Sequence, residues 1–212
     1  MKTKARNCPT ESSAANPGCP CRANAPTHRG RRRALKLGLL GAAWSPLTVF
    51  AARKPGKMRP QAGDHLVFAY GERQGEIISP GDLTLNAKPI EAYPKQLASN
   101  VIRDRSRLNA LLLVRLDPQT LPPTMDKYAA NGLVAYSAVC THTGCTVEGW
   151  DPATQQMSCP CHGSQYAAGN AAKVLMGPAP KPLAMLPLSI NSGELTVAGA
   201  FSRKVGFKVN KY

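Results

Sequence analysis

The chain has 212 residues, a formal net charge of +15 and a sequence pI near 9.8, a basic composition that first suggests nucleic-acid binding. The charge is unevenly spread. Residues 1–52 hold nine basic and one acidic residue, a net +8, and residues 53–212 hold eighteen and eleven, a net +7. Because the second part has no stripe of Lys and Arg interleaved with aromatic residues, we exclude nucleic acid as a partner. A moderately basic domain favours docking to an acidic partner instead.

Residues 1–30 are rich in Pro, Ala, Asn, Ser and Thr and lack apolar periodicity, which is typical of a disordered tail. Residues 31–52 read as a twin-arginine signal or membrane anchor, because an arginine run precedes 16 uncharged residues at 37–52. Sixteen helical residues span about 24 Å, short of a hydrocarbon core of roughly 30 Å. We predict an anchor that is retained or transient, with the domain on the periplasmic side of a bacterial inner membrane.

Residues 53–61 form a predicted linker, and residues 62–212 fit one domain. Short apolar or β-branched runs alternate there with Gly, Pro and Asp turns, which indicates an all-β fold. Strands are predicted at residues 66–70, 90–93, 108–116, 133–139, 146–150, 155–158, 183–190 and 194–198. Turns are predicted at 151–154 and 191–193, and one helical stretch at 95–104.

Two boxes of cysteine and histidine stand out in this domain, CTHTGC at residues 140–145 and CPCHGS at residues 159–164. Thiolate and imidazole together select zinc or an iron–sulfur cluster over hard cations. Four ligands from the two boxes could hold one zinc ion, which would leave Cys145 and Cys161 without a role. They could equally hold two irons, with two cysteines on one iron and two histidines on the other.

Both boxes resemble those of the Rieske iron–sulfur proteins, including the high-potential branch that carries a disulfide. The resemblance continues in the run GSQY at residues 163–166 and in the proline-containing run GPAP at residues 177–180, and it covers about residues 133–199. It implies a Rieske-type antiparallel β domain whose small cluster-binding subdomain lies at about residues 133–182. It also implies one [2Fe–2S] cluster per chain.

The resemblance assigns a role to each residue of the boxes. It implies that the buried iron is bound by Cys140 and Cys159, the exposed iron by His142 and His162, and that the disulfide joins Cys145 and Cys161. Ser164 and Tyr166 would donate hydrogen bonds to a bridging sulfide and to a cysteine sulfur. Those bonds favour the upper part of the Rieske potential range of about −150 to +300 mV. A disulfide requires an oxidising compartment, which the predicted export supplies.

The resemblance further implies electron transfer, as the iron–sulfur subunit of a quinol–cytochrome c reductase type complex with cytochrome b and c-type subunits as partners. His142 or His162 would be catalytic there, accepting the hydrogen bond and the proton of quinol. The alternative is the small Rieske subunit of a molybdenum oxidoreductase such as arsenite oxidase, which residues 133–137 resemble, with a molybdopterin subunit as partner. A Rieske oxygenase is excluded, since His28 and His65 alone cannot supply its second iron site. A zinc-binding protein is the non-redox alternative.

Overall fold

The computed structural model describes residues 54–207, and this part of the chain is all-β, as the sequence predicts. Twelve strands form two antiparallel sheets, and the helical segments among the described residues are five single 3₁₀ turns. The predicted tail at 1–30 and the predicted signal or anchor at 31–52 lie outside the described residues. Within the described part, no helix combines the length and apolarity needed to cross a bilayer.

The larger sheet has eight strands, in the spatial order β10-β5-β4-β2-β1-β12-β11, with β3 paired to β2. Its strands are β1 His65–Phe68, β2 Ile90–Gln96, β3 Val101–Ile102, β4 Leu111–Arg115, β5 Leu133–Ser137, β10 Met185–Leu186, β11 Leu188–Asn191 and β12 Glu194–Val197. The 3₁₀ turns are η1 Pro55–Lys57, η2 Pro80–Asp82, η3 Arg107–Asn109, η4 Pro118–Thr120 and η5 Pro123–Met125.

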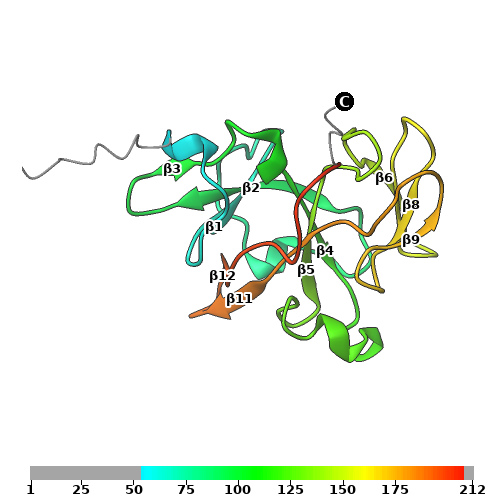
Figure 1. Cartoon of the computed structure of the whole chain (residues 1–212). Helices are drawn as coiled ribbons and strands as arrows, with labels where there is room; N and C mark the ends of the chain where they lie inside the picture. Colours follow the sequence, from blue (N-terminus) through cyan, green and yellow to red (C-terminus); the bar gives the residue numbers. More distant parts are fainter. Residues whose placement is uncertain (1–53, 208–212) are drawn as a thin grey trace, which may run out of the picture. The chain divides into compact units, whose positions relative to one another are not determined.

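The two ends of this strand order, β10 and β11, are neighbours in the sequence. Pro187 alone separates them, so the chain passes from one edge of the sheet to the other, and the sheet curls into a nearly closed barrel (Figure 1). Proline has no N–H for a ladder hydrogen bond, which suits the point where a strand changes partners. The single strand predicted at 183–190 is therefore two strands, paired with β5 and β12 respectively.

The smaller sheet contains β6 Gly149–Asp151, β7 Gln156–Ser158, β8 Gln165–Ala167 and β9 Lys173–Met176, in sequence order. Its strands lie to the right of the larger sheet in Figure 1. The predicted turn at 151–154 joins β6 to β7, and the Asp151 carboxylate accepts a hydrogen bond from the Ala153 N–H at 3.0 Å. The sequence did not predict β8 and β9, because both are short and lack alternation of apolar and polar residues.

Strands β4 and β5 form a wall between two hydrophobic cores, because successive side chains of a strand point to opposite faces. One face packs inside the barrel and includes Leu111, Leu113, Leu133 and Ala135. The other face, with Leu112, Val114, Val134 and Tyr136, packs against a core that also contains Cys140, Cys159, Met157 and Tyr166. Burial on both faces explains the continuous apolar runs in these strands. The cysteine boxes are consequently packed directly on the barrel wall.

Residues 95–104, predicted as helical, form the β2–β3 hairpin, so that prediction was wrong. Lys95 pairs with Ile102 and Gln96 with Val101. The turn between them needs a left-handed residue, which Asn100 supplies at φ +54°. The β-branched pair at 101–102 completes the ladder, and the long-range pairing of β2 with β1 outweighs a local helical preference.

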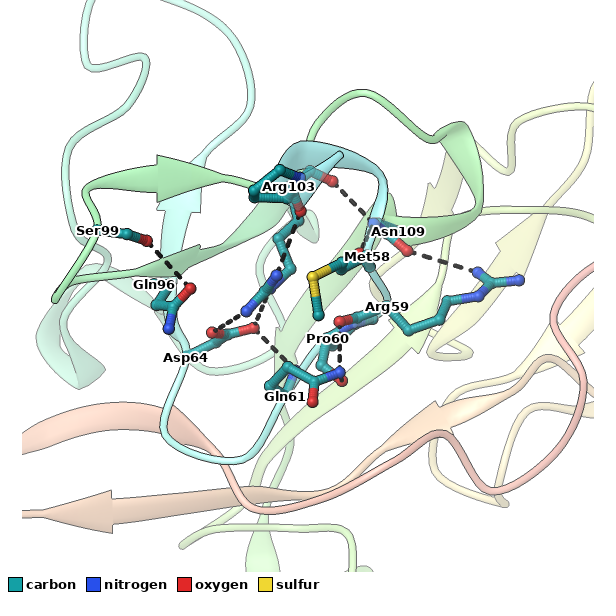
Figure 2. Close-up of polar contacts among 10 residues, drawn as sticks. Met58, Arg59, Pro60, Gln61, Asp64, Gln96, Ser99, Arg103 and Asn109 are labelled. Atoms are coloured by element: carbon teal, nitrogen blue, oxygen red, sulfur yellow. Dashed lines mark hydrogen bonds and ion pairs between the residues drawn. The ribbon is translucent and has the colours of Figure 1, made fainter. Parts of the chain in front are cut away.

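A buried ion pair fastens the segment that leads into β1 (Figure 2). The Arg103 guanidinium donates to both Asp64 carboxylate oxygens, at 2.6 and 3.1 Å, and both residues are at most 2% exposed. The Asn109 amide donates to the carbonyl oxygens of Met58 and Arg103, at 2.7 and 2.9 Å. Residues of the predicted linker 53–61 therefore contact the domain, while their role as a linker stays a prediction.

Candidate metal centre

The two boxes form two loops at the same end of the smaller sheet: a first loop, residues 140–145, and a second loop, residues 159–164. The first leads into β6 and the second joins β7 to β8, and Gly149 at the start of β6 pairs with Ser158 at the end of β7. Both loops close in the same way. The N–H of residue 140 donates to the carbonyl of 145, and that of 159 to the carbonyl of 164, each at 2.8 Å.

A disulfide between Cys145 and Cys161 joins the two loops, with the Cα atoms 6.5 Å apart, so the predicted pairing is confirmed. The sulfur atoms of Cys145, Cys159 and Cys161 all lie within 4.8 Å of one another. Since the disulfide occupies two of these sulfurs, Cys159 is the one thiol of that group that can bind a metal. The bond holds the loops side by side.

Cys140 and Cys159 are free thiols at the base of the loops, and they are 1% and 2% exposed. Burial is the main cause that raises the pKa of the Cys159 thiol, and the neighbouring Cys140 raises it further. A metal centre that binds these sulfurs as thiolates must therefore supply positive charge in an apolar setting. Both side chains belong to the core that packs on the β4–β5 wall.

His142 and His162 lie on the solvent side of the same loops, His142 half-buried and His162 exposed. Their Nδ1 atoms are 3.3 Å apart, and the rings meet edge to face with centroids 4.6 Å apart. Both imidazoles thus direct the same nitrogen toward one point, which leaves the opposite nitrogen of each ring, Nε2, on its far side. The two loops thus carry two imidazole donors near the surface and two buried thiols, which together are a mixed nitrogen–sulfur set.

Tyr166, on β8, is fully buried beside the first loop. Its hydroxyl oxygen lies 3.2 Å from the Cys140 sulfur and accepts a hydrogen bond from the Thr141 N–H at 3.3 Å. Burial, followed by the contact with Cys140, raises the pKa of the Tyr166 hydroxyl, so the group keeps its proton. With its lone pair facing the Thr141 N–H, the hydroxyl has its proton available for the cysteine sulfur.

Ser164 ends the second loop and packs against the proline-containing run at 177–180. Its hydroxyl oxygen accepts a hydrogen bond from the Ala179 N–H at 3.2 Å, which leaves the hydroxyl proton for another acceptor. Gly177 has φ +86°, and a Cβ there would lie 2.5 Å from the Ser164 Cα, so only glycine fits this approach. The Thr141 hydroxyl donates at 2.6 Å to the carbonyl of Lys181, the residue after this run, which ties the end of the run to the first loop.

Two residues outside the boxes, Arg107 and Phe207, also contact the first loop. The Arg107 guanidinium donates to the Gly144 carbonyl, and the Phe207 ring lies directly against the Gly144 Cα. Neither residue was predicted from the sequence. They lie far from the box along the chain, and neither belongs to a motif that would mark it.

Residues 95–187 match the family model described as the Rieske [2Fe-2S] domain. The chain contains a Rieske domain. Such a domain implies a [2Fe–2S] cluster, and two buried thiols with two converging imidazoles are the donor set that a Rieske cluster requires.

Relatives and solved structures of this Rieske protein were found as well. It is 29% identical over 188 residues to the cytochrome bc1 complex Rieske iron-sulfur subunit of Streptomyces coelicolor, covering 84% of this chain and 53% of that one. It is 35% identical over 99 residues to the subunit of the same name from Streptomyces lividans, covering 46% and 58%. The chain thus spans about half the length of these relatives. The soluble domain of Rieske protein II from Sulfolobus acidocaldarius is 28% identical over 45% of this chain and 66% of that one, with a TM-score of 0.37.

Proposed function

We propose that this chain is an electron carrier in which Cys140 and Cys159 bind one iron of the cluster and His142 and His162 bind the other. The convergence of the two Nδ1 atoms at 3.3 Å, above two buried thiols, is the observation that carries the proposal. When bound, the cluster supplies reversible one-electron transfer. Neutral imidazoles in place of two thiolates lower the negative charge of the centre, which raises its potential.

The protein's own groups prepare the site for this chemistry. The barrel wall and the proline-containing run exclude water from the thiol side, so charge on sulfur is stabilised by fixed donors instead of solvent. Tyr166 can donate to the Cys140 sulfur, and the hydroxyl proton of Ser164 would be free to donate to a bound cluster. Both hydrogen bonds strengthen when the centre gains an electron, which again raises the potential.

The exposed imidazoles provide the contact with an electron donor. With Nδ1 committed to the metal side, the Nε2 of His162 faces outward and can accept a hydrogen bond from a quinol hydroxyl. A bound cluster would supply the acceptor for one of the two electrons of the quinol, and this imidazole nitrogen would accept one of its two protons. A half-buried His142 is less accessible to a donor, so we assign the first contact to His162.

We assign the protein to a quinol–cytochrome c reductase type complex, with cytochrome b and c-type subunits as partners. The names of the Streptomyces relatives support this assignment. The disulfide supports an oxidising compartment on the periplasmic side, in agreement with the twin-arginine signal or membrane anchor predicted at 31–52.

Electron paramagnetic resonance of the dithionite-reduced, full-length protein tests the cluster. We expect two irons per chain and a spectrum with the low average g value of a Rieske centre. A silent spectrum together with one zinc per chain would contradict the proposal and support the zinc alternative.

The donor is tested next in the complex purified from native membranes. We expect the reduced signal to appear on addition of quinol and to disappear on addition of oxidised cytochrome c. The molybdenum oxidoreductase would be supported instead if quinol does not reduce the centre, arsenite does, and the preparation contains a molybdopterin subunit.

A further inference from the structure

The first loop is held from outside by residues that belong to neither box. We propose that Arg107 and Phe207 are positioning residues that clamp Gly144 and thereby set the geometry and the potential of the first loop. The part of this inference that concerns the potential rests on the proposed ligand set. The part that concerns the loop itself does not.

The segment 201–207 is anchored to the barrel before it reaches the loop. The Ser202 N–H donates to the Met185 carbonyl at 2.8 Å, and the Met185 N–H donates to the Ser202 hydroxyl at 2.9 Å. Val205 is 4% exposed and packs with Val139 and Ala184 in a small core of its own. Contacts outside the first loop therefore help to place the next side chains.

Phe207 ends this segment against the first loop. A Cβ at Gly144 would lie 2.5 Å from Cε1 of the Phe207 ring and 2.8 Å from Cδ1, so the ring edge covers the glycine Cα. Gly144 also has φ +88°, a conformation that L-residues avoid. The loop thus needs glycine for two reasons, its backbone conformation and its contact with Phe207. Of the Phe207 surface, 37% remains exposed, so the loop and its surroundings cover the larger part.

Arg107 holds the same residue from a second side. It lies on η3, directly before the strand β4 that forms the wall behind the site. Its guanidinium donates to the Gly144 carbonyl, in the peptide that leads to the disulfide residue Cys145 and two residues after the proposed ligand His142. A cation at this point stabilises the more negative, reduced centre. It also adds a hydrogen bond to the peptide that joins Gly144 to Cys145.

Two separate measurements, the reduction potential and hydrogen–deuterium exchange, test the clamp. Arg107→Gln removes the cation and should therefore lower the reduction potential. The expected change in the redox equilibrium constant is about threefold, which is about 28 mV at 59 mV per tenfold for one electron. Without the ring the loop loosens, so Phe207→Ala should speed hydrogen–deuterium exchange in residues 140–147 about threefold or more. Arg107→Lys should preserve the potential, and Phe207→Tyr should preserve the protection.

Arg105→Gln is the matched control. Arg105 is an exposed arginine near Arg107 in the chain, but its side chain contacts Gly56. If Arg107→Gln and Phe207→Ala behave like Arg105→Gln in both measurements, the clamp is refuted. Hydrogen exchange needs no cluster, so it tests the clamp even if spectroscopy contradicts the proposed ligands.

A double-mutant cycle tests the contact itself. Gly144→Ala should lower the free energy of unfolding more in the wild-type background than in Phe207→Ala, because the clash is present only with the ring. The cost of a left-handed alanine is common to both backgrounds and cancels. Equal destabilisation in the two backgrounds would show that Phe207 does not cover Gly144 and would overturn the proposal.

Discussion

Removing the Tyr166 hydroxyl should lower the reduction potential of the centre. In Tyr166→Phe the ring stays in its buried place and only the donor, 3.2 Å from the Cys140 sulfur, is lost. A hydrogen bond to a charged acceptor contributes about 1.5–3 kcal/mol. The potential depends only on how much stronger this hydrogen bond is in the reduced centre than in the oxidised one. We take that difference as about a third to a half of the hydrogen-bond free energy, or about 0.5–1.5 kcal/mol.

This difference converts directly into a potential. One tenfold change in an equilibrium constant is about 1.4 kcal/mol, or about 59 mV for one electron, so the expected decrease is about 20–65 mV. Protein-film voltammetry measures it, and visible circular dichroism shows that the cluster is retained. The loss of the acceptor for the Thr141 N–H also destabilises the fold, which is why stability and potential must be measured separately.

Tyr136→Phe is the matched control. Tyr136 is the second tyrosine of the same core and is equally buried, but its hydroxyl donates to the Ala168 carbonyl and makes no contact with a proposed ligand. We expect this variant to lose stability and keep its potential. An unchanged potential in Tyr166→Phe with the cluster retained, or an equal decrease in both variants, would refute the reasoning.

Three further predictions concern the domain around the site. Asp64→Asn leaves the buried Arg103 without its counter-charge and should lower the free energy of unfolding by about 3–5 kcal/mol, whereas Glu76→Gln, in an exposed pair with Arg73, should change it little; urea titration compares them. Replacing both disulfide cysteines by serine should lower the free energy of unfolding by about 3 kcal/mol, because the disulfide closes a loop with a sequence separation of 16. The midpoint of guanidinium unfolding should fall, and an unchanged midpoint would contradict this. Burial, followed by a contact with Tyr70, raises the pKa of Tyr93 to about 12, so its contribution to stability is complete below about pH 10 and is lost as pH rises through 12. The unfolding free energy of Tyr93→Phe between pH 9 and 12 should therefore fall less steeply than that of the wild type.

Much of the fold follows from local patterns. Proline, glycine and asparagine mark the turns, and the predicted turn at 191–193 is a tight hairpin turn in which Ser192 and Gly193 both have positive φ. The wrong or missing elements share one cause. The stretch 95–104 becomes a hairpin because the sheet holds β2 between β1 and β4, and the three residues of β8 become a strand because they lie between β7 and β9. Local propensity does not report such pairing with neighbouring strands.

The sequence alone determined the chemistry of the site. The ligand types, their order in two boxes and the cysteine pair available for a disulfide are properties of residues 140–164, because softness and donor capacity belong to side chains. Only the tertiary structure decided how these side chains are used. It buries the thiols on a wall shared by two cores, exposes His162, and brings Arg107 and Phe207 to Gly144. Burial and contact depend on which segments the fold brings together, and that is a property of the whole chain.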